Sequence, residues 1–552
     1  MIKFSNLEKI LLFLFLGLVF IYSCNQLKES DAFYHLKAGE LIWQMKSVPH
    51  FDVFSYTATG APWIAHEWLA QLIFYFVQAF TGFWGLIFFV ALISVLTYFI
   101  VFRLAMKQGA NFYVTLAVLF GLAFTTFKFW IPRPQIFSYL ALAILIFSLE
   151  SFRHEKKNRY LWFIIVTMLF WANTNASFLL GLVIIIFYFL AELFKKYFPY
   201  FGNRDIEGKN LKKFGSAVLA AIAVCFANPN TYHSFLYVFY VRFSVDVLMV
   251  KEWKSVLNFW QDAQTGFFLT LIAVIDLFLI WRLFFKKNER DIVWLGVVAG
   301  ISILPFISFR HCIFWPIVAV APFSICASKE LKAFFEKIDY KRLPFFALAI
   351  ILVLAGTRFL TFPRDSINKY TLPVGASDFI VENSLKGPFF NLYNEGGYLI
   401  WRFWPKEKVF IDGRSEVFGK AQLLEFFAVV KDYPDWSKIV NEKYKINYFI
   451  LAYRPDDLSR SIFPLILKLV NENWALVYWD DAGLIFLKNS PENMGIIKKY
   501  GFSYINPFRE PSKISGDEVR PAMEEVKRLL EQSPDSLFAR IYAEEFLSSH
   551  TQ

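Results

Sequence analysis

The amino-acid sequence predicts a polytopic α-helical membrane protein with about eleven transmembrane helices and a C-terminal α/β domain outside the membrane. Three observations lead to this fold class. Of the 552 residues, 57% are hydrophobic and 20% are aromatic, with 67 Phe and 17 Trp, and a soluble chain of this length does not need such a composition. Apolar runs alternate with short loops, and Lys and Arg are concentrated in every second loop. From about residue 362 the sequence acquires the pattern of a soluble α/β domain.

The apolar runs define the predicted membrane helices. A helix needs about 20 apolar residues to cross a bilayer, and several of the runs are shorter than this. The fifth is one of them, because its apolar part, residues 161–172, would rise only about 18 Å across a hydrocarbon core of about 30 Å. Irregular backbone at that depth is tolerated only around a cavity, so we expect a recessed polar cavity at its outer end. The runs lie at residues 8–24, 83–102, 112–130, 134–152, 160–173, 177–194, 214–227, 265–282, 292–308, 312–327 and 344–361.

The loop charges predict the orientation of these helices. Basic residues follow every even-numbered run, as in RHEKKNR at 153–159 and in the loop 329–342. Such loops stay in the cytoplasm, so we expect a cytoplasmic N-terminus, an uncleaved first helix and an external C-terminal domain. The same loops account for most of the net charge of +11, which therefore does not indicate nucleic-acid binding. The four cysteines show no metal-ligand spacing and indicate neither a disulfide framework nor a zinc site.

The first outer loop, residues 31–71, is dense in groups that can do chemistry. Asp31 and His35 stand four residues apart and share one face of a predicted helix. His66 and Glu67 begin a second amphipathic segment. Carboxylates and imidazoles between apolar helices are costly and tend to be functional. Other polar residues that we expect on the same side are Arg133, Gln135, Asn173, Asn175, Asn228, Arg310 and His311.

The C-terminal part reads as a small mixed or parallel sheet with helices between the strands. We expect strands at 388–393, 408–412, 446–452, 474–480 and 484–488, and a helical pair after residue 516. The Asn-Glu-Gly-Gly segment at 394–397 and Gly413 read as turns, and an Asp412–Arg414–Glu416 ion pair would be structural. The predicted domains are 1–361 with its first outer loop 25–82, the α/β domain 362–500, and the helical tail 501–552.

The pattern D-x-x-Y-H-L-K-x-G at 31–39, followed by H-E-W-L-x-Q at 66–71, stands in an outer loop directly after the first membrane helix. This layout resembles the GT-C superfamily of membrane glycosyltransferases, which take sugars from polyprenyl-phosphate carriers. The resemblance implies that the first outer loop carries the essential acid, which is Asp31 here, with Glu67 as a possible second acid. It also implies a polyprenyl-phosphate-linked sugar as donor, a periplasmic glycan, lipid or protein as acceptor, and a place in the bacterial inner membrane.

Sugar transfer needs a base for the acceptor hydroxyl and positive groups for the departing phosphate. Asp31 is the predicted base, although Asp before a helix is also a good N-cap. Arg133 and Arg310 are the predicted phosphate ligands, since Arg binds phosphate bidentately, and the alternative for both is contact with lipid headgroups. The predicted substrate-binding residues are His35, His66, Gln135, Asn173, Asn175, Asn228 and His311. The three asparagines could instead satisfy backbone at the short helices, and His66 and Glu67 could instead cap the helix that follows them.

No cofactor is expected, although a divalent cation at Asp31, Glu67 and a histidine is an alternative. Two other functions stay open. A lipid-linked glycan transporter or flippase would place its polar site near the membrane midplane between internal repeats, and no clear repeat is present. A non-catalytic scaffold in envelope polysaccharide assembly would tolerate the loss of Asp31.

Overall fold

The structure is a computed structural model that describes residues 4–198, 205–242, 251–286, 291–332, 343–431, 434–452 and 458–550. Parts of the basic loops and of the segment 231–264 therefore lie outside the described residues. The chain forms two compact units. Unit 1 comprises Met1–Asn25, Ile42–Val48 and Ile64–Ser366, and unit 2 comprises Gln26–Leu41, Pro49–Trp63 and Ile367–Gln552.

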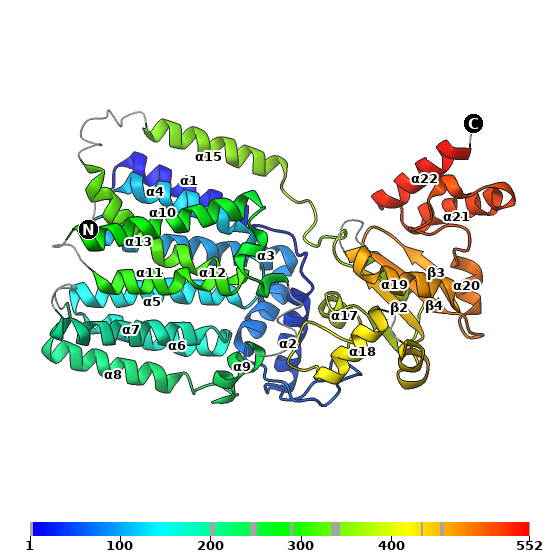
Figure 1. Ribbon diagram of the computed structural model, residues 1–552, viewed down its shortest axis with the longest axis horizontal. Helices are drawn as coiled ribbons and strands as arrows, with labels where there is room; N and C mark the ends of the chain where they lie inside the picture. Colours follow the sequence, from blue (N-terminus) through cyan, green and yellow to red (C-terminus); the bar gives the residue numbers. More distant parts are fainter. Residues whose placement is uncertain are drawn as a thin grey trace. The chain divides into compact units, whose positions relative to one another are not determined.

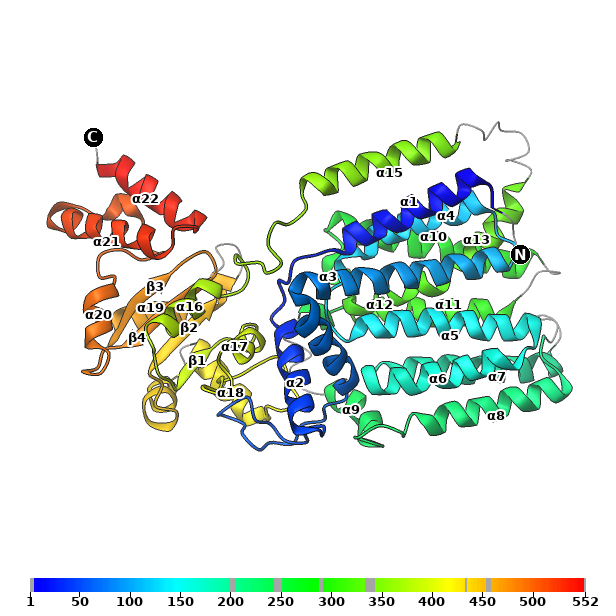
Figure 2. The same cartoon turned by 180° about the vertical axis from the view of Figure 1, so that it is seen from behind.

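Unit 1 is helical, and each of the eleven apolar runs contributes a helix to it. Figures 1 and 2 show α5, α6, α7 and α8 running side by side. Six described helices are long and apolar enough to cross a membrane, while the count of eleven spans stays a prediction. The helices are α1 (Asn6–Ser23), α3 (Trp68–Lys107), α4 (Phe112–Thr126), α5 (Gln135–Glu155), α6 (Asn158–Thr174), α7 (Phe178–Tyr197), α8 (Gly208–Val224), α9 (His233–Arg242), α10 (Ala263–Phe285), α11 (Ile292–Ser302), α12 (Leu304–Ile307), α13 (Phe314–Glu330) and α15 (Leu343–Leu360), with short 3₁₀ turns at η1 (Phe127–Phe129), η4 (Lys251–Trp253), η5 (Val256–Phe259) and η7 (Phe309–His311).

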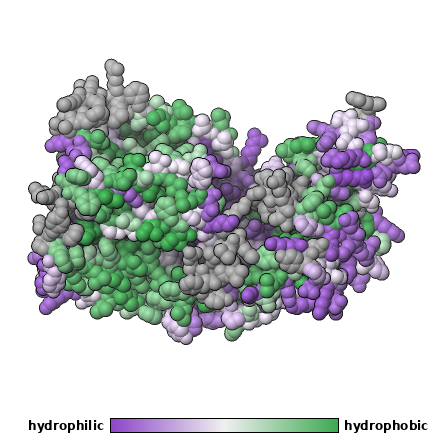
Figure 3. Space-filling view, in the orientation of Figure 1, coloured by the Kyte–Doolittle hydropathy of each residue, from purple (hydrophilic) through white to green (hydrophobic). Residues whose placement is uncertain are grey.

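Helix α3 joins the amphipathic segment that begins near His66 to the second apolar run. The joint lies at Gly82, whose φ of 71° interrupts the helical backbone. A residue with a Cβ rarely adopts this conformation, so glycine permits the kink. The fifth predicted helix, α6, has 17 residues because polar residues extend the apolar part that the sequence marks. On the face shown in Figure 3, hydrophobic residues cover much of the surface of the unit 1 helices.

Unit 2 contains a four-stranded sheet in the order β1-β2-β4-β3. The first pair, β1 (Phe389–Asn391) and β2 (Tyr448–Ala452), is parallel, while β4 (Gly483–Lys488) pairs antiparallel with β2 and with β3 (Trp474–Trp479). The mixed sheet and the helical pair after residue 516 agree with the sequence. The helices are α16 (Val374–Glu382), α17 (Gly396–Phe403), α18 (Lys420–Val430), α19 (Leu458–Asn471), α20 (Met494–Tyr500), α21 (Val519–Gln532) and α22 (Leu537–His550), with a π-helical turn η9 (Lys438–Lys443) and 3₁₀ turns η10 (Pro511–Lys513) and η11 (Gly516–Glu518).

The predicted strand at 408–412 is wrong. This segment forms only an isolated bridge between Ser55 and Val409, because its backbone groups bond to other partners. The amide of Val409 donates to the Phe54 carbonyl (3.1 Å), and the Asn391 side chain bonds Phe410 N and Ile411 O. Of the predicted turn at 394–397, only Asn394 and Glu395 form a turn, because Gly396 and Gly397 are the first residues of α17.

The first outer loop is shared between the units. Helix α2 (Asp31–Met45) begins in unit 2 and its last turn belongs to unit 1. Segments 26–41 and 49–63 pack with the C-terminal segment, whereas the sequence-based division placed the whole loop in the first domain. The unit boundary near the C-terminal domain lies at Ser366, close to the expected boundary at residue 361.

Candidate functional site

The predicted site residues of unit 1 fall into two clusters. The first gathers Glu67 and the two asparagines at the end of α6. Asn175 Nδ2 donates to Glu67 Oε1 (2.9 Å), and Asn173 Oδ1 accepts from the indole N–H of Trp68 (3.0 Å). The His66 imidazole lies 3.6 Å from Glu67. All four polar residues are buried, so these bonds keep a carboxylate within the helical unit.

The asparagine contacts also serve the local backbone. Asn173 Nδ2 donates to the carbonyls of Leu169 and Ala227, which ties the end of α6 to the segment after α8. Asn228 donates to the Cys225 carbonyl (2.7 Å) and accepts from Ser234 Oγ (2.9 Å). These are the bonds that the structural alternative for the asparagines predicts.

The second cluster brings together the two predicted phosphate ligands. Arg133, just before α5, donates from Nη1 to both carboxylate oxygens of Glu252 at 2.9 and 3.2 Å. Arg310, in η7, stacks its guanidinium on the Trp253 ring at 4.8 Å. Removal from water raises the pKa of Glu252, but Arg133 and Arg310 outweigh it and hold the pKa below its ordinary value. Two arginines from distant segments thus act on one carboxylate.

Backbone bonds hold this second cluster in place. The Ser308 hydroxyl donates to the Glu252 carbonyl (2.8 Å), and the Phe309 amide donates to the Lys254 carbonyl (2.8 Å). At the start of α5, Gln135 Oε1 is buried and has no hydrogen-bond partner among the described residues. His311 lies in η7 beside Phe314. The position of Glu252 next to the arginines therefore comes from the backbone as well as from its ion pair.

Unit 2 holds Asp31 and His35. Asp31 is the first residue of α2 and partly buried, while His35 is 3% exposed. Asp31 lies against the Gly413 backbone: a Cβ built on Gly413 would be 2.6 Å from Asp31 Oδ1. The preceding residue, Ser30, accepts a hydrogen bond from the Tyr398 amide at 2.7 Å. The two glycine-containing motifs of the C-terminal segment thus lie beside the predicted base.

The ion pair around Arg414 has a partner that the sequence does not reveal. Arg414 Nη2 donates to Asp412 Oδ2 (2.7 Å) and to Asp52 Oδ1 (2.6 Å), so its pairs are Asp412 and Asp52 and not the expected Glu416. All three of these groups are 2% exposed or less. The guanidinium also lies over the Trp63 ring at 4.6 Å. Asp52 comes from the first outer loop, so this buried cluster joins that loop to the C-terminal segment.

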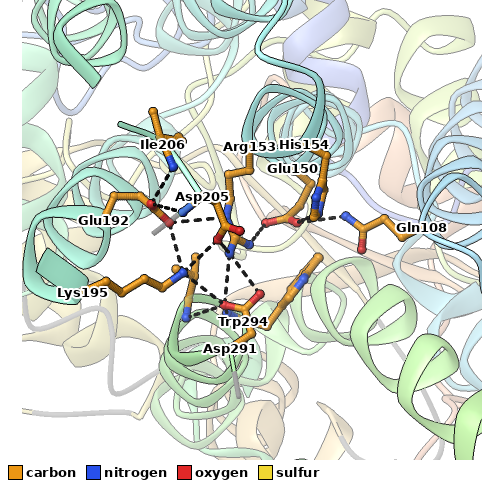
Figure 4. A network of polar contacts seen from close by, with 11 residues as sticks. Gln108, Glu150, Arg153, His154, Glu192, Lys195, Asp205, Ile206, Asp291 and Trp294 are labelled. Carbon is orange, nitrogen blue, oxygen red and sulfur yellow. Dashed lines mark hydrogen bonds and ion pairs between the residues drawn. The ribbon is translucent and has the colours of Figure 1, made fainter. Parts of the chain in front are cut away.

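A third group of charges in unit 1 contains none of the predicted site residues (Figure 4). Arg153 is 2% exposed and pairs with Glu150 (2.7 Å), Asp205 (2.5 Å) and Asp291 (3.0 Å). Lys195 pairs with Asp205 at 2.9 Å. The sequence presents Arg153 as a loop charge, yet the network ties α5 and α7 to the segments before α8 and α11. A cavity of about 740 Å³ next to it is lined by Gln108, Glu150, His154, Asp291 and Trp294, among others.

Glu252, Asp52 and Tyr398 are site residues that the sequence did not predict. Glu252 had a usable signal, because it is an acid in an aromatic segment between two apolar runs and is therefore a candidate partner for the isolated Arg133 and Arg310. Tyr398 takes part through its backbone amide, which no side-chain pattern can reveal. Among the described residues, no group of three or more His, Cys, Asp or Glu side chains is arranged to hold a metal ion.

No protein-family model matches this chain, and no curated protein matches its sequence. Solved structures do match its fold. The oligosaccharyltransferase of Archaeoglobus fulgidus, tethered to an acceptor peptide, superposes with a TM-score of 0.56 at 12% identity and covers 88% of this chain and 74% of its own. The same enzyme, AglB, in complex with an inhibitory peptide and a dolichol-phosphate, gives 0.51 at 12% identity, with 89% and 75% covered. ArnT from Cupriavidus metallidurans in the apo state gives 0.50 at 11% identity, with 88% and 98% covered.

The fold of this chain is therefore similar to that of AglB and ArnT. The likeness extends over most of the chain and confirms the fold that the first outer loop suggests. At 11–12% identity this likeness shows the fold alone.

Proposed function

We propose that this chain is a membrane glycosyltransferase that moves a sugar from a polyprenyl-phosphate carrier to an acceptor outside the cytoplasm. The fold is the first support, since AglB and ArnT are similar over most of this chain. One of the matching structures is AglB in complex with an inhibitory peptide and a dolichol-phosphate. The observation that carries the proposal is the cluster of Arg133 and Arg310 around Glu252.

In the proposed reaction the acceptor hydroxyl oxygen attacks the anomeric carbon of the donor. Asp31 takes the hydroxyl proton, and the bond between the anomeric carbon and the phosphate oxygen breaks. The electron pair of that bond stays on the polyprenyl phosphate, whose charge Arg133 and Arg310 stabilise. Direct displacement of this kind inverts the anomeric centre.

The other predicted residues would position the substrates. Glu67, held by Asn175 and accompanied by His66, would serve as the second acid. Asn173, Asn228, His35, Gln135 and His311 stay proposed contacts to sugar or carrier. A divalent cation near the acids stays an alternative.

The test replaces Asp31 by Asn in cells that otherwise lack this chain. The measured product is the glycan or lipid-linked sugar whose peak in the mass spectrum disappears in cells without the protein. Asn caps a helix as well as Asp does, but it cannot accept the hydroxyl proton, so we expect product formation to fall by about 10²- to 10⁴-fold. Asp378→Asn is the matched control, because that carboxylate forms an exposed pair with Arg402.

Normal product from a well-expressed Asp31→Asn variant would remove the proposed base. A product that depends on the protein but not on Asp31 would favour a transporter, and the absence of any such product would favour a scaffold.

A further inference from the structure

The strongest unexplained feature of unit 2 is the close approach of two glycine motifs to the start of α2. The motifs are residues 394–398 (NEGGY) and 411–414 (IDGR). The sequence offers turn formation as the reason for their glycines. The structure gives another reason at Gly413: its φ is not positive, so backbone conformation does not require glycine there. A Cβ at this position would instead meet the Asp31 carboxylate at 2.6 Å.

The backbone at Gly413 is held from both sides. Its carbonyl accepts a hydrogen bond from Tyr393 Oη (3.0 Å). The next residue, Arg414, is fixed by Asp412 and Asp52 in a buried, charge-assisted cluster. Such bidentate bonds are directional and strong. This peptide therefore cannot yield easily, and an added methyl group would displace the Asp31 side chain.

The residue before Asp31 is held by the other motif. The Tyr398 amide donates to Ser30 Oγ at 2.7 Å, and the Tyr398 ring meets the Phe33 ring edge-on at a centroid distance of 5.0 Å. A Cβ at Gly397 would lie 2.5 Å from the Ser30 carbonyl oxygen. Here the obstructing atom belongs to backbone, which has little freedom to move.

We propose that the 394–398 and 411–414 motifs pack against the start of α2 and position the Asp31 carboxylate, with Gly413 as the positioning residue. The inference rests on the proposed function, in which Asp31 is the base. This packing places the carboxylate next to the Gly413 peptide. A reaction that needs near-attack geometry is sensitive to displacements of about 1 Å, which can lower the rate by about 10²-fold.

The test compares two Gly→Ala variants of the full-length protein in open membrane vesicles. Gly413→Ala adds a methyl group against Asp31. Gly495→Ala in α20 is the matched control, because nothing lies within 4 Å of its Cβ position. The measured quantity is the rate of formation of the product peak, followed from pH 5 to pH 9, together with the thermal unfolding of each purified variant.

We expect Gly413→Ala to lower the rate by about 10-fold or more with an unchanged unfolding temperature, and Gly495→Ala to do neither. Crowding by the methyl group removes water from the carboxylate and raises its pKa. The acidic limb of the rate profile should then move to higher pH, and a merely structural role would not produce this shift.

Ser30→Ala is the second variant, in case Gly413→Ala unfolds. It removes the acceptor of the Tyr398 amide without adding an atom, and it should also lower the rate. A rate and pH profile equal to wild type in the folded variants would overturn the positioning role of the two motifs, while the effect of Asp31→Asn would still support the proposed function. Full activity of Asp31→Asn would overturn both proposals.

Discussion

Replacing Glu252 by Gln tests whether the two arginines of unit 1 bind phosphate. Arg133 now donates to both oxygens of Glu252 at 2.9 and 3.2 Å. A phosphate that approaches Arg133 must compete with this carboxylate. A glutamine at this position keeps the shape of the side chain and removes its negative charge, so the competition weakens. We expect a polyprenyl phosphate to bind the Glu252→Gln variant more tightly than the wild type.

The size of the effect follows from the exposure of the pair. The Arg133 side chain is 14% exposed and the Glu252 side chain is 37% exposed, so solvent screens part of the attraction. Exposed pairs contribute up to about 1 kcal/mol, which corresponds to about a 5-fold change in dissociation constant. The backbone bonds from Ser308 and Phe309 should keep the segment in place in the variant.

The assay titrates undecaprenyl phosphate into the full-length protein in lipid nanodiscs. Asp262→Asn is the control, because it removes a carboxylate charge beside Lys128 at 3.3 Å and leaves a good N-cap for α10. Its affinity should equal that of the wild type. Equal or weaker binding by Glu252→Gln would show that Glu252 does not compete with phosphate for Arg133. Unchanged binding by Arg133→Gln would show that Arg133 does not bind the phosphate.

Two further predictions concern unit 2. Arg414→Met should destabilise the protein by about 3–5 kcal/mol, because it leaves the buried Asp52 and Asp412 carboxylates unpaired. Arg402→Met should have little effect, because its pair with Asp378 is largely exposed. Chemical unfolding measures the stability of both variants, and equal effects would contradict a stabilising role of the Arg414 ion pairs. Burial raises the pKa of Asp480 to about 6, against the lowering by hydrogen bonds from Ala482, Tyr478 and Gly483. The pKa of Asp480 in the folded state is then above the unfolded value of about 3.9. Binding of this proton therefore stabilises the fold at pH 4, and the stabilisation is lost as the pH rises through 6. The loss is about 2 kcal/mol after allowance for partial exposure. Asp480→Asn should therefore gain stability relative to wild type between pH 4 and pH 7, and an equal difference at both pH values would contradict it.

The helical part of the fold was predictable because its signal is local. Each apolar run forms a helix, and the glycine at position 82 marks the kink in α3. The strand prediction at 408–412 failed for the opposite reason. The short apolar run from Val409 to Ile411 predicts a buried segment, but only distant partners decide whether its backbone pairs in a sheet. Here those partners are Phe54 and the Asn391 side chain.

The residues of the site were in part predictable from the sequence, but the contacts between them were not. Arg133 and Arg310 stood out as isolated cations beside apolar runs, and the structure brings both to Glu252. The salt bridge between Asp52 and Arg414 joins residues 362 positions apart, and no spacing rule reaches across such a distance. Whether Asp31 and Glu67 share a site with the arginines stays a prediction, since the two acids belong to different units.

Charge balance explains two of the buried clusters without a further function. The buried Arg414 has two carboxylates, and Arg153 has Glu150, Asp205 and Asp291 within ion-pair distance. In both places the carboxylates match or outnumber the cations, so fold stability is a sufficient explanation. Arg133 and Arg310 come from different segments, and both act on the Glu252 carboxylate. An anion that reaches them in place of Glu252 gains from both guanidiniums, and a phosphate with its delocalised charge and several acceptor oxygens is suited to both.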